Sequence, residues 1–92
     1  KNDIKIKEEF NFTQSAKDLL ITSQLRTALI FNREIKATNY QIDTYKKKIF
    51  IYGISLTADE RKAVINEAKE ILDVKDVIVS IILVEDLRIQ KN

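Results

Sequence analysis

Four carboxylates gather in one segment of the chain, where they could form a catalytic acid–base pair. Asp59 and Glu60 are adjacent, and Glu67 and Glu70 follow within a few helical turns. Two carboxylates in unlike environments can act as general acid and general base. Basic residues are interleaved with them, namely Arg61, Lys62 and Lys69. Because these spacings form weak surface ion pairs, the pattern favours the solvated side and cap of a helix over an active site.

The residue types that are missing exclude most other chemistry. The 92 residues contain no His, Cys, Met or Trp, and a single Gly. Zinc, haem, copper and iron–sulfur centres need imidazole, thiolate or thioether ligands, and Ser-His-Asp or Cys-His sites need side chains that are absent. One glycine cannot supply a Gly-rich phosphate-binding loop, and no EF-hand-like loop is present. We therefore expect no enzyme and no cofactor or metal, and a function based on contact.

The charge pattern limits the partners. Sixteen basic and fourteen acidic residues give a net charge of +2, and the only basic run is Lys46-Lys47-Lys48. A nucleic-acid-binding domain usually carries a strongly basic face, so we expect no nucleic-acid partner. The longest apolar stretch, residues 77–84, is far shorter than the roughly 20 residues that span a bilayer, so we expect no transmembrane segment.

A helix is predicted at about residues 16–31. Its apolar stripe at helical spacing is Ile21, Leu25, Ala28 and Leu29. Further apolar residues lie partly off that stripe, namely Leu19, Leu20, Ile30 and Phe31. The helix is thus apolar over a wider face than one core contact requires, and we expect Phe31 to be in the core.

Residues 39–45 and 48–56 predict a β-hairpin, because they are rich in Ile, Tyr and Phe and are separated by a short basic turn. The second strand is apolar on both faces, which places it in the middle of its sheet. Gly53 within it indicates a bulge or a close backbone approach. The turn contains no Gly, which disfavours the type I′ geometry common in tight hairpins.

A second helix is predicted at about residues 58–72. Thr57 and Glu60 match a capping box, in which each side chain satisfies a backbone N–H at the helix start. Its predicted buried stripe is Val64, Ala68, Ile71 and Leu72. Residues 77–84 then predict a third strand, which most simply returns parallel to the second through a right-handed crossover.

These elements predict an α+β fold: a single αββαβ domain with a three-stranded mixed sheet and two helices on one face. The second and third strands are apolar on both sides. The face away from the helices should therefore meet a neighbouring domain or form a partner site.

The order and register of these elements resemble the BON domain, named for bacterial osmotically inducible and nodulation proteins. The first half of the pattern is carried by Asp18, Ile21, Leu25, Ala28-Leu29, Ile35, Ile49, Ile51 and Gly53. The second half is carried by Glu60, Ala68, Ile71, Val74, Val77, Ile81 and Leu83. Two departures are the turn without Gly and Asp73, which stands where the family has Gly.

The resemblance implies a compartment and a wider architecture. Residues 1–14 look like the closing strand of a preceding BON domain or a linker, residues 15–85 the BON domain, and residues 86–92 a C-terminal tail. The alternative for Asn2–Ile6 is an edge strand or arm of this same domain. The chain opens at Lys1 without Met, as a mature product or an excised portion would. It resembles the second BON domain of a dual-BON envelope lipoprotein, which implies a stress-response protein in the periplasm, held at the outer membrane by an upstream lipid anchor.

The expected binding residues lie at one end of the fold. If the first helix runs antiparallel to the first strand, the lysine run of the turn lies near the helix start. The candidate lipid-binding residues are then Lys17, Leu19, Leu20, Lys46, Lys47 and Lys48. Lysines beside exposed leucines suit an anionic phospholipid surface, a partner that the resemblance also implies.

Plainer explanations exist for the same residues. The lysines can form a solvated hairpin tip, and the leucines can pack on a preceding domain or on residues 10–12. A second hypothesis is a protein-interaction module. In it, the open sheet face, through Phe50, Tyr52 and Ile54 or the residues opposite, docks a neighbouring BON domain or another envelope partner.

Overall fold

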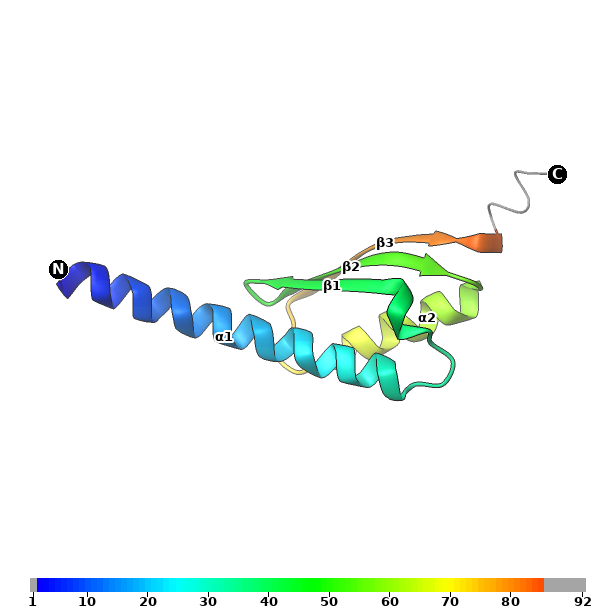
Figure 1. The fold of residues 1–92 in the computed structure, drawn as a ribbon, viewed down its shortest axis with the longest axis horizontal. Coiled ribbons are helices and arrows are strands. Elements are labelled where there is room, and N and C mark those ends of the chain that lie inside the picture. The colour runs from blue at the N-terminus through cyan, green and yellow to red at the C-terminus, as the bar shows by residue number, and fades with distance from the viewer. Residues whose placement is uncertain (1, 86–92) are drawn as a thin grey trace.

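The computed structural model describes the backbone of residues 2–85 and the side chains of residues 15–85. Its elements are α1 (Asn2–Phe31), a 3₁₀ turn η1 (Ala37–Asn39), β1 (Tyr40–Tyr45), β2 (Lys48–Ser55), α2 (Ala58–Lys69) and β3 (Asp76–Leu83). Figure 1 shows both helices on the same side of the sheet. The predicted α+β class and αββαβ order are confirmed.

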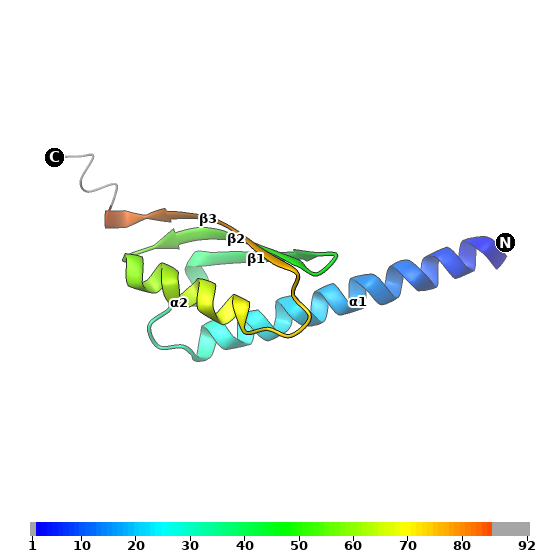
Figure 2. The ribbon, with the colours of Figure 1, turned by 180° about the vertical axis from the view of Figure 1, so that it is seen from behind.

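The sheet has the order β1-β2-β3, with β2 in the centre as predicted. β1 and β2 are antiparallel, with Ile42 opposite Ile51, and β2 and β3 are parallel, with Ile51 beside Val79. Figure 2 shows from behind how α2 connects the two parallel strands. One face of the sheet is therefore covered by the helices, and the other is uncovered in the part of the chain that the structure describes.

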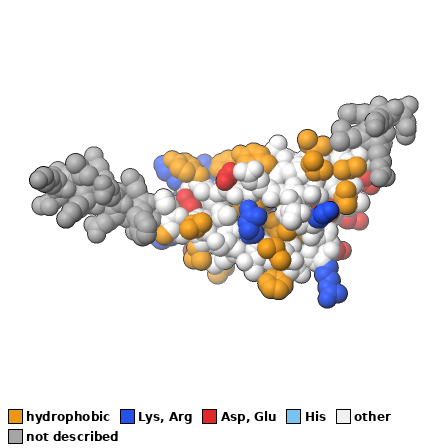
Figure 3. Space-filling model, viewed as in Figure 1, with side chains coloured by type: hydrophobic (Ala, Val, Ile, Leu, Met, Phe, Trp, Pro, Cys, Tyr) orange, Lys and Arg blue, Asp and Glu red, His pale blue; other side chains and the backbone are white. Residues whose placement is uncertain are grey.

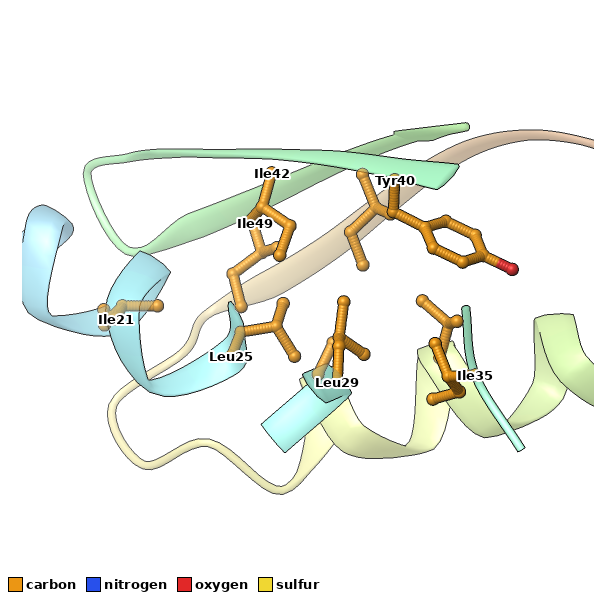
Figure 4. Close-up of a cluster of buried hydrophobic side chains, with 10 residues drawn as sticks. Ile21, Leu25, Leu29, Ile35, Tyr40, Ile42 and Ile49 are labelled. Carbon is orange, nitrogen blue, oxygen red and sulfur yellow. The ribbon is translucent and has the colours of Figure 1, made fainter. Parts of the chain in front are cut away.

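The core lies between the sheet and the helices. The buried hydrophobic residues are Ile21, Leu25, Leu29, Ile35, Tyr40, Ile42, Ile49, Ile51, Val64 and Ala68. Figure 4 shows Ile21, Leu25 and Leu29 of α1 facing the strands. Because these three residues recur every four positions, they form one stripe of the helix, as predicted. Burying side chains of this size contributes roughly 1.5–3 kcal/mol each.

Two apolar residues that were predicted to be buried are exposed. Phe31 is 79% exposed, because it lies two residues beyond Leu29 and therefore on nearly the opposite side of α1. Leu72 is 84% exposed, because α2 ends at Lys69 and helical spacing no longer governs the residues that follow. The prediction for Phe31 was wrong because this residue lies off the buried stripe of α1, and the prediction for Leu72 was wrong because the helical period was extended past the end of α2.

The N-terminal segment is helical, contrary to expectation. Helix α1 begins at Asn2 and not near residue 16, so Asn2–Ile6 is not a strand. The helix projects beyond the sheet at its N-terminal end (Figure 1). The side chains of residues 1–14, and the tail at 86–92, lie outside the described residues. The division into residues 1–14, 15–85 and 86–92 stays a prediction.

Gly53 allows two strands to approach closely, as its sequence context predicted. A Cβ atom at this position would lie 2.8 Å from Cδ1 of Tyr40, 3.0 Å from its Cα, and against the carbonyl oxygen of Asn39. Two of these atoms belong to the backbone, which cannot swing aside. Glycine is therefore required here for steric reasons, although its φ is not positive.

Glu60 is the polar residue that fastens the start of α2. The N–H of Glu60 donates to Thr57 Oγ1 at 3.1 Å, which is one half of the predicted capping box. The carboxylate, however, accepts from the N–H groups of Leu56 and Lys36, both at 3.0 Å. Glu60 is thus buried between two segments, although the sequence placed it on the solvated side or the cap of the helix. Burial opposes its charged form, but these N–H donors outweigh burial and hold the pKa of Glu60 below its ordinary value.

Candidate functional site

The hairpin turn adopts the geometry that its composition disfavoured. Lys46 has a φ of 50° and Lys47 a φ of 67°, both in the left-handed region that a two-residue type I′ turn requires. Non-glycine residues rarely adopt this conformation, so it must be stabilised by neighbouring groups. The prediction against this turn was wrong because it considered the turn sequence alone.

Asp18 supplies that stabilisation from α1. Its Oδ2 accepts from the N–H of Lys46 at 2.8 Å, and its Oδ1 accepts from the N–H of Lys47 at 3.1 Å. Successive N–H groups in a left-handed turn form a concave site for an anion, and here the anion is this carboxylate. Because Asp18 is 7% exposed, its two charge-assisted hydrogen bonds are shielded from water. One turn of α1 further on, the hydroxyls of Thr22 and Thr44 are 2.7 Å apart.

This attachment places the turn beside residues 17–22 of α1. A depression of about 320 Å³ lies at the junction. Its lining consists of Lys17, Leu20, Ile21, Gln24, Lys47, Leu72 and Asp73. Leu20 is 58% exposed and Leu72 84% exposed. We call Lys17, Leu20, Lys47 and Leu72 the basic rim, since two lysines and two exposed leucines surround the same depression.

The other predicted site residues lie elsewhere. Leu19 belongs to a separate depression that is lined also by Thr22, Thr44 and Tyr45. The ammonium group of Lys46 lies over the Tyr45 ring, 5.4 Å from its centroid. Lys48 is exposed at the start of β2, in register with Tyr45 of β1 and Asp76 of β3. The structure thus brings together three of the six predicted residues, namely Lys17, Leu20 and Lys47.

Two residues that sequence reasoning missed adjoin this region. Leu72 was assigned to the core, although Asp73, with a φ of 67°, already indicates a change of chain direction there. Tyr45 is 62% exposed and places an aromatic ring at the turn. Its position directly before the lysine run was a usable signal, because aromatic rings favour membrane interfaces. In Figure 3, hydrophobic and basic side chains adjoin at this end of the sheet.

The carboxylates of α2 do not form a reactive pair. The Glu60 carboxylate accepts hydrogen bonds from backbone N–H groups. Glu67 Oε2 accepts from Asn32 Nδ2 at 2.8 Å, and this bond joins α2 to the end of α1. Among residues 15–85, no group of three acidic side chains is arranged to hold a metal ion. What these carboxylates do in the described structure is connect segments of the fold.

A second exposed surface lies on the side of the sheet away from the helices. Its apolar members alternate along two parallel strands and are Phe50, Tyr52, Ile54, Ile78 and Ile82, which we call the outer face. All except the half-buried Phe50 are more than 40% exposed. Their neighbours in β1 are polar or amphipathic. Exposed apolar groups in a contiguous patch indicate a contact surface.

The αββαβ domain thus has an open sheet face and exposed apolar surfaces that can serve for contact. A family model for the BON domain matches residues 17–85. The chain therefore belongs to the BON domain family, a family of membrane- or protein-binding modules. No helix in the described part of the chain is long and apolar enough to cross a bilayer.

The chain is also similar to a curated protein of Anaplasma centrale, described as "Uncharacterized protein in gshII 5'region". The two are 31% identical over 78 residues, which cover 84% of this chain and 52% of the relative. The chain thus spans about half the length of that protein.

Proposed function

We propose that this BON domain binds the anionic phospholipid surface of a membrane through the basic rim. In this proposal it is part of a periplasmic envelope protein, held at the outer membrane by an upstream lipid anchor, and it supports outer-membrane integrity. The observation that carries the proposal is the meeting of Lys17 and Leu20 from α1 with Lys47 from the turn around one depression.

The chemistry of the rim suits a lipid surface. Ammonium groups interact with lipid phosphates, and adjacent leucines can enter the boundary between head groups and acyl chains. The rim has a fixed shape because Asp18 holds the turn against α1. Asp73 lines the same depression and reduces the local positive potential, so we expect electrostatic attraction to be moderate.

The expected affinity is low for the isolated domain. The two lysines of the basic rim contribute about 1 kcal/mol each near an anionic leaflet, and partial burial of its two leucines adds about 2 kcal/mol. A total of about 4 kcal/mol corresponds to a dissociation constant of about 1 mM. Such binding becomes effective when an anchor or a second contact raises the local concentration, which is the role of the proposed lipid anchor.

Vesicle flotation tests the proposal. The chain should float with vesicles that contain 30% phosphatidylglycerol at millimolar accessible lipid, and should not float with pure phosphatidylcholine. Raising the salt concentration should weaken binding. Replacement of two rim lysines, Lys17→Gln/Lys47→Gln, should reduce affinity by about thirtyfold, the equivalent of about 1 kcal/mol for each lysine.

A matched variant controls for loss of charge. Arg61→Gln/Lys62→Gln removes two exposed charges from the start of α2, at the opposite end of the domain from the turn (Figure 1). This variant should retain nearly full binding. Equal losses in the two variants, or equal flotation with both vesicle types, would contradict a specific role for the rim.

The outer face favours a second candidate function, the docking of a neighbouring BON domain or another envelope protein. Flat apolar surfaces without central charges are typical of protein contacts. The variant Tyr52→Ser/Ile54→Ser separates the two functions. It should leave vesicle binding unchanged and weaken binding to a separately produced neighbouring BON domain, whereas the rim variant should do the reverse.

A further inference from the structure

β3 is an edge strand of unusual composition. It pairs with β2 on one side and is the outermost strand of the sheet (Figures 1 and 2). An edge strand presents a row of backbone N–H and C=O groups that can pair with another strand. The outer edge of β3 is therefore a template for β-strand addition.

Natural edges usually carry features that prevent such pairing, including short length, charged residues, Pro or a bulge. β3 has eight residues, and the seven from Val77 to Leu83 contain no charge and no Pro. Val79 and Ile82 are 37% and 54% exposed. From Val77 to Leu83, β3 therefore lacks the charges and the proline that usually prevent edge pairing.

The opposite edge of the sheet provides an internal comparison. β1 has six residues, and its outward positions include Gln41 and Asp43. It is also fastened to α1 near its end through the Thr22–Thr44 contact. Within the described residues, the chain thus protects one edge of the sheet by polarity, short length and a helix, and leaves the other edge without this protection.

The composition of β3 also identifies the kind of strand that fits. Antiparallel pairing of two identical strands about a two-fold axis at Ser80 places Ile78 opposite Ile82 on the outer face. On the other face it places Val79 opposite Ile81. This pairing keeps the Asp76 residues of the two strands at opposite ends of the interface, so that like charges do not meet. The Glu85 carboxylate lies just beyond β3 and accepts from the N–H of Ala58 at 3.1 Å, so it takes no part in the pairing. Parallel pairing in register would instead place Asp76 beside Asp76.

We propose that β3 pairs antiparallel with β3 of a second copy of this chain about a two-fold axis at Ser80, which joins two three-stranded sheets into one. The interface is isologous, so it closes after two copies. It also makes the two outer faces continuous. The pairing does not use the basic rim and is independent of lipid binding.

Cysteine cross-linking tests the axis, because the chain contains no Cys. Residues opposite one another in antiparallel strands have Cα atoms about 4.5–5.5 Å apart, within the range that a disulfide spans. Ser80→Cys should form a disulfide-linked dimer under mild oxidation at micromolar concentration, at least tenfold faster than Gln41→Cys. The control places the thiol at an exposed position of the other edge strand. Equal rates would overturn the proposal.

Two further variants test the register. A mixture of Ile78→Cys and Ile82→Cys chains should give mainly the mixed disulfide, because these two positions face each other across the axis. If each variant links mainly to itself, β3 does not pair in the proposed way.

Sedimentation without lipid tests whether the pairing occurs in the native sequence. The wild-type chain should show a concentration-dependent dimer. Ser80→Lys places two ammonium groups at the axis and should shift the equilibrium from dimer to monomer. Gln41→Lys should leave the monomer–dimer equilibrium unchanged. A wild-type monomer at hundreds of micromolar, open-ended aggregation, or a Ser80→Lys dimer would each contradict the proposal. Vesicle flotation of Ser80→Lys should still occur, so failure of this proposal is distinct from failure of lipid binding.

Discussion

The basic rim and the outer face are both exposed and partly apolar, but the fold builds them differently. The rim joins α1 to the hairpin turn and depends on the Asp18 carboxylate, which holds two lysines in left-handed geometry. The outer face lies on strands alone, and its alternating apolar residues follow from sheet geometry. The two surfaces therefore differ in charge. The basic rim places lysines beside exposed leucines, which suits a lipid surface, whereas the outer face is apolar and has no charged residue among its members.

The largest effect should come from the glycine that supports both surfaces. Gly53→Ala forces a methyl group against the backbone of Asn39 and Tyr40, which should lower the free energy of unfolding by about 3 kcal/mol. Urea denaturation measures the change, with Ser80→Ala on exposed β3 as a control that should shift it by less than about 0.5 kcal/mol. Because the β1–β2 register carries both surfaces, both should be impaired together. A loss below about 1 kcal/mol would show that the close approach can relax.

A smaller loss of stability should come from a substitution that affects the basic rim and leaves the outer face unchanged. Asp18→Asn puts an amide where a carboxylate accepts two N–H bonds, so it should cost about 2 kcal/mol of stability. In amide spectra the Lys46 and Lys47 signals should move while those of β3 stay in place. Asp43→Asn, at an exposed position of β1, is the matched control and should change stability by under about 0.5 kcal/mol. If the two variants behave alike, the turn does not depend on α1.

The pH dependence tests the end of the domain far from the rim. Burial raises the pKa of Tyr40 to about 12, although its hydrogen bond to Ser55, 2.6 Å long, favours ionisation. The unfolded chain ionises this phenol near pH 10, so the folded state gains stability below that value and loses it progressively between pH 10 and 12. Tyr40→Phe should cost about 1 kcal/mol at neutral pH and remove this part of the alkaline loss.

The comparison of wild type with Tyr40→Phe in urea at several alkaline pH values isolates this contribution from other titrating groups. Tyr52→Phe, whose ring is exposed on the outer face, should cost little at neutral pH. Vesicle binding at neutral pH should be unchanged in both variants. If Tyr40→Phe and wild type lose stability in parallel above pH 10, the buried phenol does not control that loss.

The smallest effects on stability should come from substitutions of exposed residues, and these substitutions best show which surface makes which contact. Leu72→Ser and Ile82→Ser each replace an exposed residue and should change the free energy of unfolding by less than about 0.5 kcal/mol. Leu72→Ser should reduce vesicle binding severalfold without changing self-association, and Ile82→Ser should do the opposite. Flotation measures vesicle binding and sedimentation measures self-association, and both are applied to each variant. If either variant changes both readouts, the two surfaces are not separate.

The sequence predicted the fold well because its apolar periods are regular. The stripe through Ile21, Leu25 and Leu29, and the alternation around Ile49 and Ile51, each correspond to one buried face. Failures occurred where a long-range contact decides the local conformation. The left-handed turn at Lys46 depends on a carboxylate 28 residues earlier in the chain, which no local pattern reveals.

The candidate site was predicted in part for the same reason. Antiparallel packing of a helix on a hairpin brought Lys17 and Lys47 together, as the topology required. Leu72 was missed because helical spacing was extended past Lys69, where α2 ends. Leu19 and Leu20 line different depressions, because adjacent residues on a helix point about 100° apart.

The most direct test of the account is to map amide chemical shifts while the chain is titrated with bicelles that contain phosphatidylglycerol. The account predicts that the signals of Lys17, Leu20, Lys47 and Leu72 move most, that the movement decreases with added salt, and that Tyr52 and Ile54 stay in place. Shifts concentrated on the outer face, or identical shifts with purely zwitterionic bicelles, would contradict it.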